Sequence, residues 1–217
     1  MKTAIIFDTE STGLKAPELI EAAWISLISP TNLTPVAEFS QRYKPSKPIE
    51  LGALCVHNIY DEELATCNAS DTFVLPNADY VIGHNIDYDF NVIGNPDGYK
   101  RICTQALSRA LWPDIDSHKQ SAMIYLLERA TARERLKNAH AALDDVKNCL
   151  VLLSHIISKL GITDWDALWV ASEKARIPTV MPFGKHKGEA ISSIPKAYLA
   201  WLKKQPDVDA YLMQALG

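Results

Sequence analysis

The sequence predicts an α/β protein in which a mixed sheet is flanked by helices and followed by a small module. Three observations lead to this prediction. Short apolar runs, such as 4–7 and 79–83, have the length and composition of buried strands. Longer segments with apolar residues at helical spacing, such as 138–160, follow the later runs. The last of these closes at Gly161, as helices often do at a glycine, and the composition changes after it.

The first part of the chain predicts three strands in a meander. After the run 4–7, a second apolar stretch covers 19–28. A segment over 36–43 then alternates between apolar and polar residues and ends before Pro45. Residues 51–65 follow an extended, proline-containing link and are expected to be helical.

The next part of the chain predicts strands that lead into helices. A strand over 79–83 runs into a helix that Asn85 can cap. A further strand is expected to begin at Arg101. Helices are then expected over the segments 105–111, 120–130 and 138–160.

A domain boundary is expected between residues 1–160 and residues 161–217. In the second part, Thr163 can cap a helix over 164–174, and another helix is expected over 195–204. The chain of 217 residues is long enough to bury one full core and to carry this small second module.

The composition excludes several classes of protein. Apolar residues make up 47% and charged residues 22% of the chain, as in ordinary globular proteins. No apolar run approaches the roughly 20 residues of a membrane-spanning helix, and the run before Asp8 is too short for a signal peptide. The four cysteines form no C-x-x-C pair, which predicts reduced thiols. We therefore expect a cytoplasmic protein that does not bind a membrane.

Charge is unevenly distributed along the chain. The formal net charge is −4, but the segment from Lys174 to Lys204 has seven Lys or Arg residues and one acid, Glu189. That segment therefore carries +6, and the remaining residues carry −10. An acidic body with a basic C-terminal segment fits a metal-dependent domain joined to a phosphate-binding one, although solvated lysine-bearing surfaces are also common.

The motif F-D-T-E-S-T-G, over residues 7–13, ends the first predicted strand. Because side chains alternate along a strand, Asp8 and Glu10 project to the same side, about 6–7 Å apart. Two carboxylates held so close resist joint ionisation, and a divalent cation with oxygen ligands removes the conflict. A strand end with two solvated acids explains the same residues, so this motif alone leaves both interpretations open.

Two later motifs add acids and a histidine. The first is H-N-I-D-Y-D over 84–89, after a predicted strand, and the second is H-A-A-L-D-D over 140–145. Two metal ions about 3.5–4 Å apart need several carboxylates, and a histidine can accept the proton of an attacking water. Together the three motifs predict two-metal hydrolysis of a phosphodiester.

The three motifs, in this order, resemble those of the DEDDh 3′→5′ exonucleases. The resemblance covers residues 1 to about 160 and implies a ribonuclease-H-like fold, two Mg²⁺ or Mn²⁺ ions and removal of nucleotides from a free 3′ end. It implies that the metal carboxylates are Asp8, Glu10, Asp89 and Asp145, with His140 as the catalytic base. It places near the substrate Thr9, Thr12, Gly13, Leu14, His84 and Asn85.

Two of these assignments have alternatives. Asp87 offers a second carboxylate beside Asp89, and the resemblance favours Asp89 because an aromatic residue precedes it. Helical spacing from His140 favours Asp144, because residues i and i+4 share a face. The resemblance favours Asp145, which agrees with the spacing if His140 lies on a loop before the helix.

The C-terminal segment resembles the small C-terminal module of one member of this family. The pattern is M-P-F-G-K-H-K-G over 181–188, followed by Y-L-A-W-L over 198–202. Its glycines allow backbone amides to approach phosphates, and Lys185 and Lys187 supply positive charge. The residues expected to form the core of the module are Phe183, Ile191, Ile194, Leu199, Trp201 and Leu202.

The function expected from these features is metal-dependent 3′→5′ exonuclease activity on single-stranded or duplex DNA ends, in repair or recombination. An RNA-directed exonuclease of the same family is one alternative. A catalytically idle module that binds nucleic acid is another, although all five catalytic positions are occupied by suitable residues.

Overall fold

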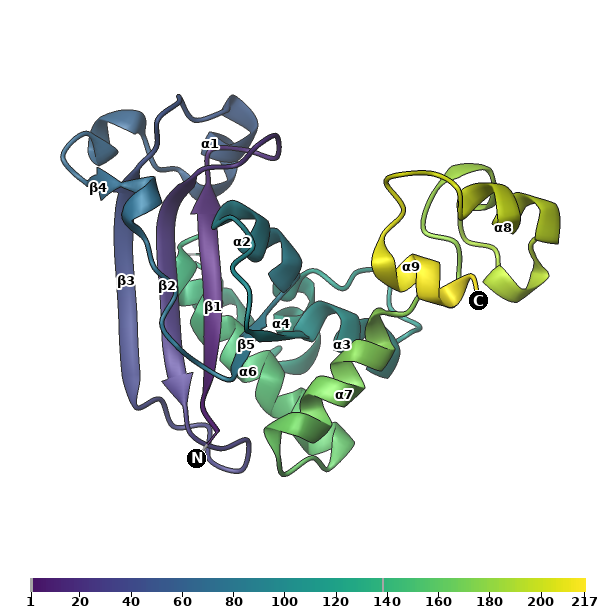
Figure 1. Cartoon of the computed structure of the whole chain (residues 1–217). Coiled ribbons are helices and arrows are strands. Elements are labelled where there is room, and N and C mark those ends of the chain that lie inside the picture. The colour runs from purple at the N-terminus through teal and green to yellow at the C-terminus, as the bar shows by residue number, and fades with distance from the viewer. Residues whose placement is uncertain (1, 138) are drawn as a thin grey trace. The chain divides into compact units, whose positions relative to one another are not determined.

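The strand β1 (Ala4–Ser11) is the centre of the sheet in the computed structural model, which describes residues 2–137 and 139–217 (Figure 1). It pairs antiparallel with β2 (Leu19–Leu27) and parallel with β5 (Tyr80–Gly83). Within the described residues the strand order is β4-β3-β2-β1-β5-β6. The outer strands are β3 (Ala37–Lys44), β4 (Asn68–Ala69) and β6 (Lys100–Cys103). This mixed sheet confirms the α/β prediction.

Helices cover the sheet. The longest, α6 (Ala142–Leu160), packs on β1 and β2 through a buried stripe that includes Cys149, Leu152 and Ile156 (Figure 1). These residues recur at three- and four-residue intervals, as the apolar face of a helix requires. The other helices of this part of the chain are α1 (Leu51–His57), α2 (Ile86–Val92), α3 (Thr104–Leu111), α4 (Gln120–Leu127), α5 (Ala132–Arg135) and α7 (Trp165–Arg176).

The start of α6 differs from the expected helix over 138–160. Asn138 lies outside the described residues, and the helix begins at Ala142. His140 has a φ of 71°, in the left-handed region, so it lies on the loop before the helix. The i,i+4 relation to Asp144 therefore does not apply, and this removes the conflict between spacing and resemblance. The helix ends at Gly161 as expected, with a φ of 64°.

Of the two expected helix caps, one has the expected position without the capping hydrogen bond, and the other lies one residue later. Asn85 occupies the position before α2, but its backbone is left-handed and its side chain makes no capping hydrogen bond. At α7, the Asp164 carboxylate rather than Thr163 accepts a hydrogen bond, from the backbone N–H of Ala167 at 2.8 Å. The region 51–65 also divides, because the helix α1 ends at a left-handed residue and a 3₁₀ turn follows.

The chain divides into two compact units after Ser172 rather than at residue 160. The start of α7 belongs to the first unit because Trp165 contacts Tyr80, with ring centroids 6.4 Å apart. Asp166, on the same turn, accepts a hydrogen bond from Lys100 at 2.8 Å. These contacts bind the beginning of α7 to the sheet.

The second unit, Glu173–Gly217, has its own small core. It contains α8 (Lys196–Leu202) and α9 (Ala210–Ala215), the second of which was not expected from the sequence. The buried residues are Met181, Ile191, Ile194, Leu202, Leu212 and Leu216, with Leu199 partly buried against them.

Two residues expected in this core lie on the surface. Phe183 is 46% exposed and Trp201 is 53% exposed. Leu199 and Leu202 are three positions apart and share the face of α8 that packs inward, and Trp201 projects away from that face. The prediction was therefore wrong for these two rings, and it omitted Met181, Leu212 and Leu216, which are buried in the core.

Across the described residues, no single helix has the length and apolar character needed to cross a membrane. The pair Ala142–Leu160 and Trp165–Arg176, bent by 93°, meets the criterion only when its two helices are taken together, by length and composition.

The packing of α6 leads to a stability prediction. Replacing the fully buried Leu152 by alanine leaves a cavity under the sheet, so Leu152→Ala should lower the free energy of unfolding by about 2–5 kcal/mol. The matched control Leu51→Ala removes a side chain that is 79% exposed and should change it by less than about 1 kcal/mol. Chemical denaturation measures both, and equal losses would contradict the described packing.

Candidate metal centre

Acidic side chains from three elements meet beside the middle of the sheet. Asp8 and Glu10 alternate with the buried Thr9 along β1, as the two-residue period of a strand requires. Asp89 comes from α2, and Asp145 comes from the first turn of α6. The sequence separates these acids by more than 130 residues, and the fold brings them to one place.

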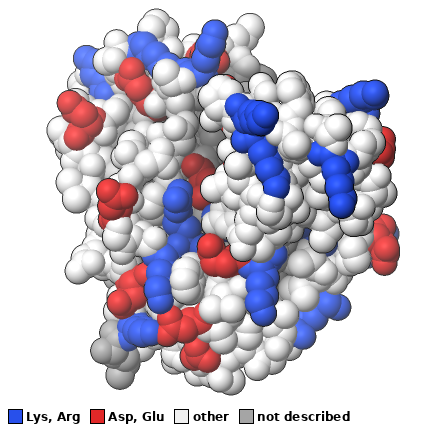
Figure 2. Space-filling model, turned by 45° about the vertical axis from the view of Figure 1, so that its right-hand side comes forward, with Lys and Arg blue, Asp and Glu red and all other residues white. Residues whose placement is uncertain are grey.

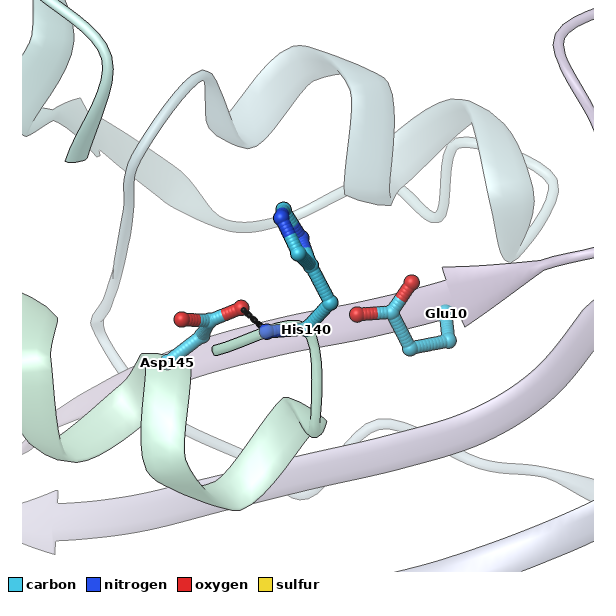
Figure 3. A group of neighbouring side chains, drawn as sticks. All are labelled: Glu10, His140 and Asp145. Atoms are coloured by element: carbon cyan, nitrogen blue, oxygen red, sulfur yellow. Dashed lines mark hydrogen bonds between the residues drawn. The ribbon is translucent and has the colours of Figure 1, made fainter. Parts of the chain in front are cut away.

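His140 lies beside two of the acids. One potential ligand atom from each of Glu10, His140 and Asp145 lies within 4.8 Å of the others (Figure 3). The backbone N–H of His140 donates a hydrogen bond to Asp145 Oδ2 at 3.0 Å. Gln120 Nε2 donates to Asp145 Oδ1 at 3.2 Å. Two hydrogen bonds, one to each carboxylate oxygen, therefore fix the Asp145 side chain beside the loop that carries His140.

Asp89 is held against β1 by two hydrogen bonds. The backbone N–H and the hydroxyl of Thr9 both donate to Asp89 Oδ1, at 3.0 and 2.8 Å. Asp89 is only 3% exposed. Thr9, expected near the substrate, therefore orients a carboxylate of the cluster.

Burial and mutual repulsion oppose ionisation of the four acids. Burial, together with the charges of Asp89, Asp145 and Glu10, raises the pKa of Asp8 well above its ordinary value. Burial raises the pKa of Asp89 to about 7, although its hydrogen bonds from Thr9 act in the opposite direction. Burial and the neighbouring acids raise the pKa of Glu10 to about 9, and burial also raises that of Asp145. A bound divalent cation would offset this penalty, and carboxylate oxygens are the ligands that Mg²⁺ and Mn²⁺ prefer.

The geometry favours Asp89 over Asp87 and Asp145 over Asp144. Asp87 is exposed and forms an ion pair with Arg101 at 3.0 Å. Asp145, rather than Asp144, shares the group with Glu10 and His140 among the described residues.

Glu21 is a buried acid of this site that sequence reasoning missed. It lies on β2 directly opposite Glu10 and is 8% exposed. Its Oε2 accepts a hydrogen bond from the backbone N–H of Ala142 at 2.9 Å, which fixes the start of α6 close to the cluster. The signal was present in the sequence, because a single acid inside the apolar run 19–28 has to find partners when the strand is buried.

A cavity of about 370 Å³ adjoins the cluster, where β1 ends and α1 begins. Gly13 lies in its wall and has a φ of 154°, a backbone conformation that favours glycine; a Cβ atom there would also lie 2.3 Å from the Glu50 carboxylate, which would have to move. Leu14 is 83% exposed at the same cavity. Thr12 is fully buried, and its hydroxyl accepts a hydrogen bond from the backbone N–H of Glu18 at 3.0 Å.

The other expected substrate residues lie in different settings. Both ring nitrogens of His84 have protein partners: Nδ1 lies 3.0 Å from Thr104 Oγ1, and Nε2 lies 2.8 Å from the carbonyl oxygen of His118. Burial lowers the pKa of His84 to about 4, so the ring is neutral near pH 7. Asn85 is exposed. Lys185 and Lys187 are exposed in the second unit, on and just after a 3₁₀ turn over Gly184–His186.

Comparisons with known proteins agree with the resemblance seen in the motifs. Exodeoxyribonuclease 10 of Escherichia coli (strain K12) is 27% identical over 205 residues, which cover 91% of this chain and 89% of that protein. A family model described as "Putative quorum-sensing-regulated virulence factor" matches residues 174–208, which include the basic segment from Lys174 to Lys204.

Solved structures show the same fold. "Exonuclease X in complex with 5' overhanging duplex DNA" matches with a TM-score of 0.60 at 22% identity, over 78% of this chain and 99% of that one. The nuclease domain of 3'hExo, "a DEDDh family member, bound to rAMP", matches with a TM-score of 0.56 at 14% identity, over 72% of this chain and 92% of that one.

The fold is therefore the ribonuclease-H-like fold of the DEDDh exonucleases, and the expected family resemblance is confirmed. The particular relative whose C-terminal pattern this chain resembles is exonuclease X, and Exodeoxyribonuclease 10 is similar to the chain over nearly its whole length.

The raised pKa of Asp89 leads to a prediction about pH. Its pKa is about 7 in the folded chain, against an ordinary value of 3.8. Between pH 3.8 and pH 7 the folded chain therefore binds more protons than the unfolded chain, and its stability falls as the pH rises. Above pH 7 the charged carboxylate destabilises the folded chain by the full amount. With divalent ions removed, Asp89→Asn should raise the thermal midpoint at pH 8, and the gain should shrink toward pH 4.

Calorimetry at several pH values measures this effect. Asparagine keeps an oxygen that can accept the hydrogen bonds from Thr9, so the change isolates the charge. The control Asp207→Asn alters an exposed acid of the second unit and should leave the midpoint unchanged. A gain that grows as the pH falls would contradict the assignment.

Proposed function

We propose that this chain is a metal-dependent 3′→5′ exonuclease that releases nucleotides from DNA 3′ ends. The observation that carries the proposal is the group of four buried or partly buried carboxylates, with a histidine beside two of them, on a fold whose relatives are exonucleases. Because these carboxylates are costly to ionise together, a bound cation is needed to offset their mutual repulsion.

The carboxylates fit a pair of hard divalent cations. Asp8, Glu10, Asp89 and Asp145 would hold Mg²⁺ or Mn²⁺ through oxygen atoms. When bound, two such ions supply an activated water and stabilise charge on the leaving oxygen of a phosphodiester. The chain contributes the positions of the ligands, and Thr9 and Gln120 hold two of the carboxylates by hydrogen bonds.

His140 is suited to take the proton of the attacking water. Imidazole is the side chain that ordinarily exchanges protons near neutral pH. His140 is exposed and lies on a loop, so its ring can reach a water at the cluster, and its backbone is tied to Asp145. The hydrogen bond between Glu21 and Ala142 supports this loop from the side of the sheet.

The neighbouring cavity would receive the 3′-terminal nucleotide. Its wall at Gly13 brings backbone close to the space, and Leu14 offers an exposed apolar side chain for a base. Thr12 is buried and shapes the turn that carries both residues. His84 has partners on both nitrogens, so in this proposal it supports the neighbouring elements, whereas the exposed Asn85 can contact the strand.

The two compact units suggest a division of labour between a nuclease domain and a smaller basic module. Lys185 and Lys187 would contact phosphates of the substrate. Activity in DNA repair or recombination and a cytoplasmic location belong to the same proposal, and the four unpaired cysteines fit a reducing compartment. An RNA-directed exonuclease is the second candidate, because the 3'hExo nuclease domain was solved with rAMP.

Digestion of labelled oligonucleotides tests the activity. Wild-type protein should shorten 5′-labelled DNA from its 3′ end with Mg²⁺ or Mn²⁺ and not with EDTA. Mutating a residue that only hydrogen-bonds to a metal ligand lowers activity by roughly 10–100-fold. Asp8→Ala removes a proposed ligand itself, so it should lower the rate of digestion by at least roughly 100-fold. Faster cleavage of a matched RNA strand would favour the second candidate.

The control for this experiment is Asp207→Asn, which should digest DNA at the wild-type rate. Asp8→Ala should remain folded because it removes one of the repelling charges. An Asp8→Ala protein as active as wild type would contradict the proposal. Binding to a 3′ end without any release of nucleotides would instead indicate an idle binding module.

The lysines of the second unit lead to a separate prediction. Replacing Lys185 and Lys187 by alanine should weaken DNA binding and reduce the slope of log K against log salt by roughly 0.7 for each lysine that meets a phosphate of a single strand. Binding isotherms at several salt concentrations measure the slope. An unchanged slope would show that these lysines do not contact phosphates.

A further inference from the structure

The second unit exposes aromatic rings beside its lysines. Phe183 is 46% exposed and Trp201 is 53% exposed, whereas the apolar residues of the core cluster are almost fully buried. Single exposed apolar residues are ordinary on protein surfaces, but contiguous ones mark interaction sites. We use the name aromatic patch for the two exposed rings, Phe183 and Trp201, together with the half-buried His186 and Tyr198, which lie in a row with Trp201.

Three rings of the patch are held in contact with one another. His186 lies edge-on to Tyr198 with ring centroids 4.5 Å apart, and Tyr198 lies 5.4 Å from Trp201. His186 Nδ1 is also 3.0 Å from Glu189 Oε2. These contacts join the turn over 184–186 to the helix α8. The exposed ring of Trp201 therefore packs against Tyr198, which is itself held by His186.

The turn itself is built closely against this row of rings. Gly184 has a φ of 72°, and a Cβ atom placed there would lie 3.1 Å from the Tyr198 hydroxyl. Glycine therefore allows the turn to approach Tyr198 and brings Lys185 and Lys187 to the same part of the unit. A supported, pre-positioned ring loses little side-chain entropy when a ligand stacks on it.

The unit that carries the patch has a positive net charge. Residues 173–217 carry seven Lys or Arg and four Asp or Glu, a net charge of +3, so the remaining residues carry −7. Of the acids, Glu189 is paired with His186, and Asp209 accepts hydrogen bonds from backbone N–H groups at the start of α9. Within the described residues, Lys185 and Lys187 form no ion pair. On the face drawn in Figure 2, lysine and arginine side chains are spread among acidic ones.

We infer that the aromatic patch and its two lysines form a binding site for single-stranded DNA on the second unit. Unpaired bases have free faces that stack on exposed aromatic rings, and the lysines meet the phosphates between them. In a duplex the bases are already stacked on one another, so the site favours single strands over blunt duplex. The inference rests on the proposed function in taking DNA as the nucleic acid.

Binding is measured by fluorescence anisotropy with the full-length chain in an Asp8→Ala background, so that no strand is digested. The probe is a 5′-fluorescein oligothymidylate, and a blunt duplex is measured in parallel. Stacking of one base is worth about 1–3 kcal/mol by alanine substitution, so Trp201→Ala should raise the Kd for the single strand roughly 5- to 150-fold. Phe183→Ala should add to this loss, and the Kd for duplex should change less than about twofold.

Matched variants separate stacking from folding. Trp201→Phe keeps an aromatic face and should retain most of the affinity, whereas Trp201→Leu keeps an apolar side chain without such a face and should lose it. Met213→Ala, which truncates another exposed apolar residue of the same unit, should bind as well as the parent protein. Circular dichroism confirms that each variant is folded.

Three results would overturn the inference: unchanged single-strand affinity in Trp201→Ala and Phe183→Ala, equal loss on duplex and single strand, or full affinity in Trp201→Leu. The outcome is independent of the proposed catalysis. If the parent sequence released no nucleotides with Mg²⁺ while the ring variants still lost single-strand affinity, the exonuclease proposal would fail and this binding site would stand.

Discussion

Repulsion between carboxylates gathered at one side of a sheet is the constraint on which the candidate site depends. Burial and neighbouring charge raise the pKa values of Asp8, Glu10, Asp89 and Asp145 together. Well-packed apolar residues at these positions would make the fold more stable, because unpaired buried charge is costly. The cost is understandable if the acids bind cations, and this connects the electrostatics to the proposed function.

The fold holds the four repelling groups by attaching them to three different elements. β1 carries two acids at alternate positions, and hydrogen bonds from Thr9 hold Asp89 of α2 against the same strand. Glu21 on β2 accepts a hydrogen bond at the start of α6, the helix that carries Asp145. Because these elements pack around the central strand, the hydrophobic core supplies the free energy that keeps the charges together.

Most strands and the longest helix could be predicted because local pattern determines them, whereas Asp89 and Asp145 were expected from the family resemblance. Alternation along β1 placed Asp8 and Glu10 on one side, and the apolar stripe of α6 followed from its spacing. The role of Glu21 could not be predicted in the same way, because it depends on the register between β1 and β2 and on a contact with a helix about 120 residues later.

The second unit was harder to predict for a related reason. Its helices are short, so helical position decides which of several apolar side chains face inward, and Trp201 projects outward although its neighbour Leu202 is buried.

Calorimetric titration of Mn²⁺ at pH 7, in two buffers with different ionisation enthalpies, tests most directly the claim that the four acids bind cations. We predict saturable binding of two ions with release of protons, because Glu10 has a pKa of about 9 and must give up its proton to become a ligand, and we predict that Asp8→Ala weakens this binding. Absence of saturable binding, or binding that releases no protons and is unaffected by Asp8→Ala, would contradict the account.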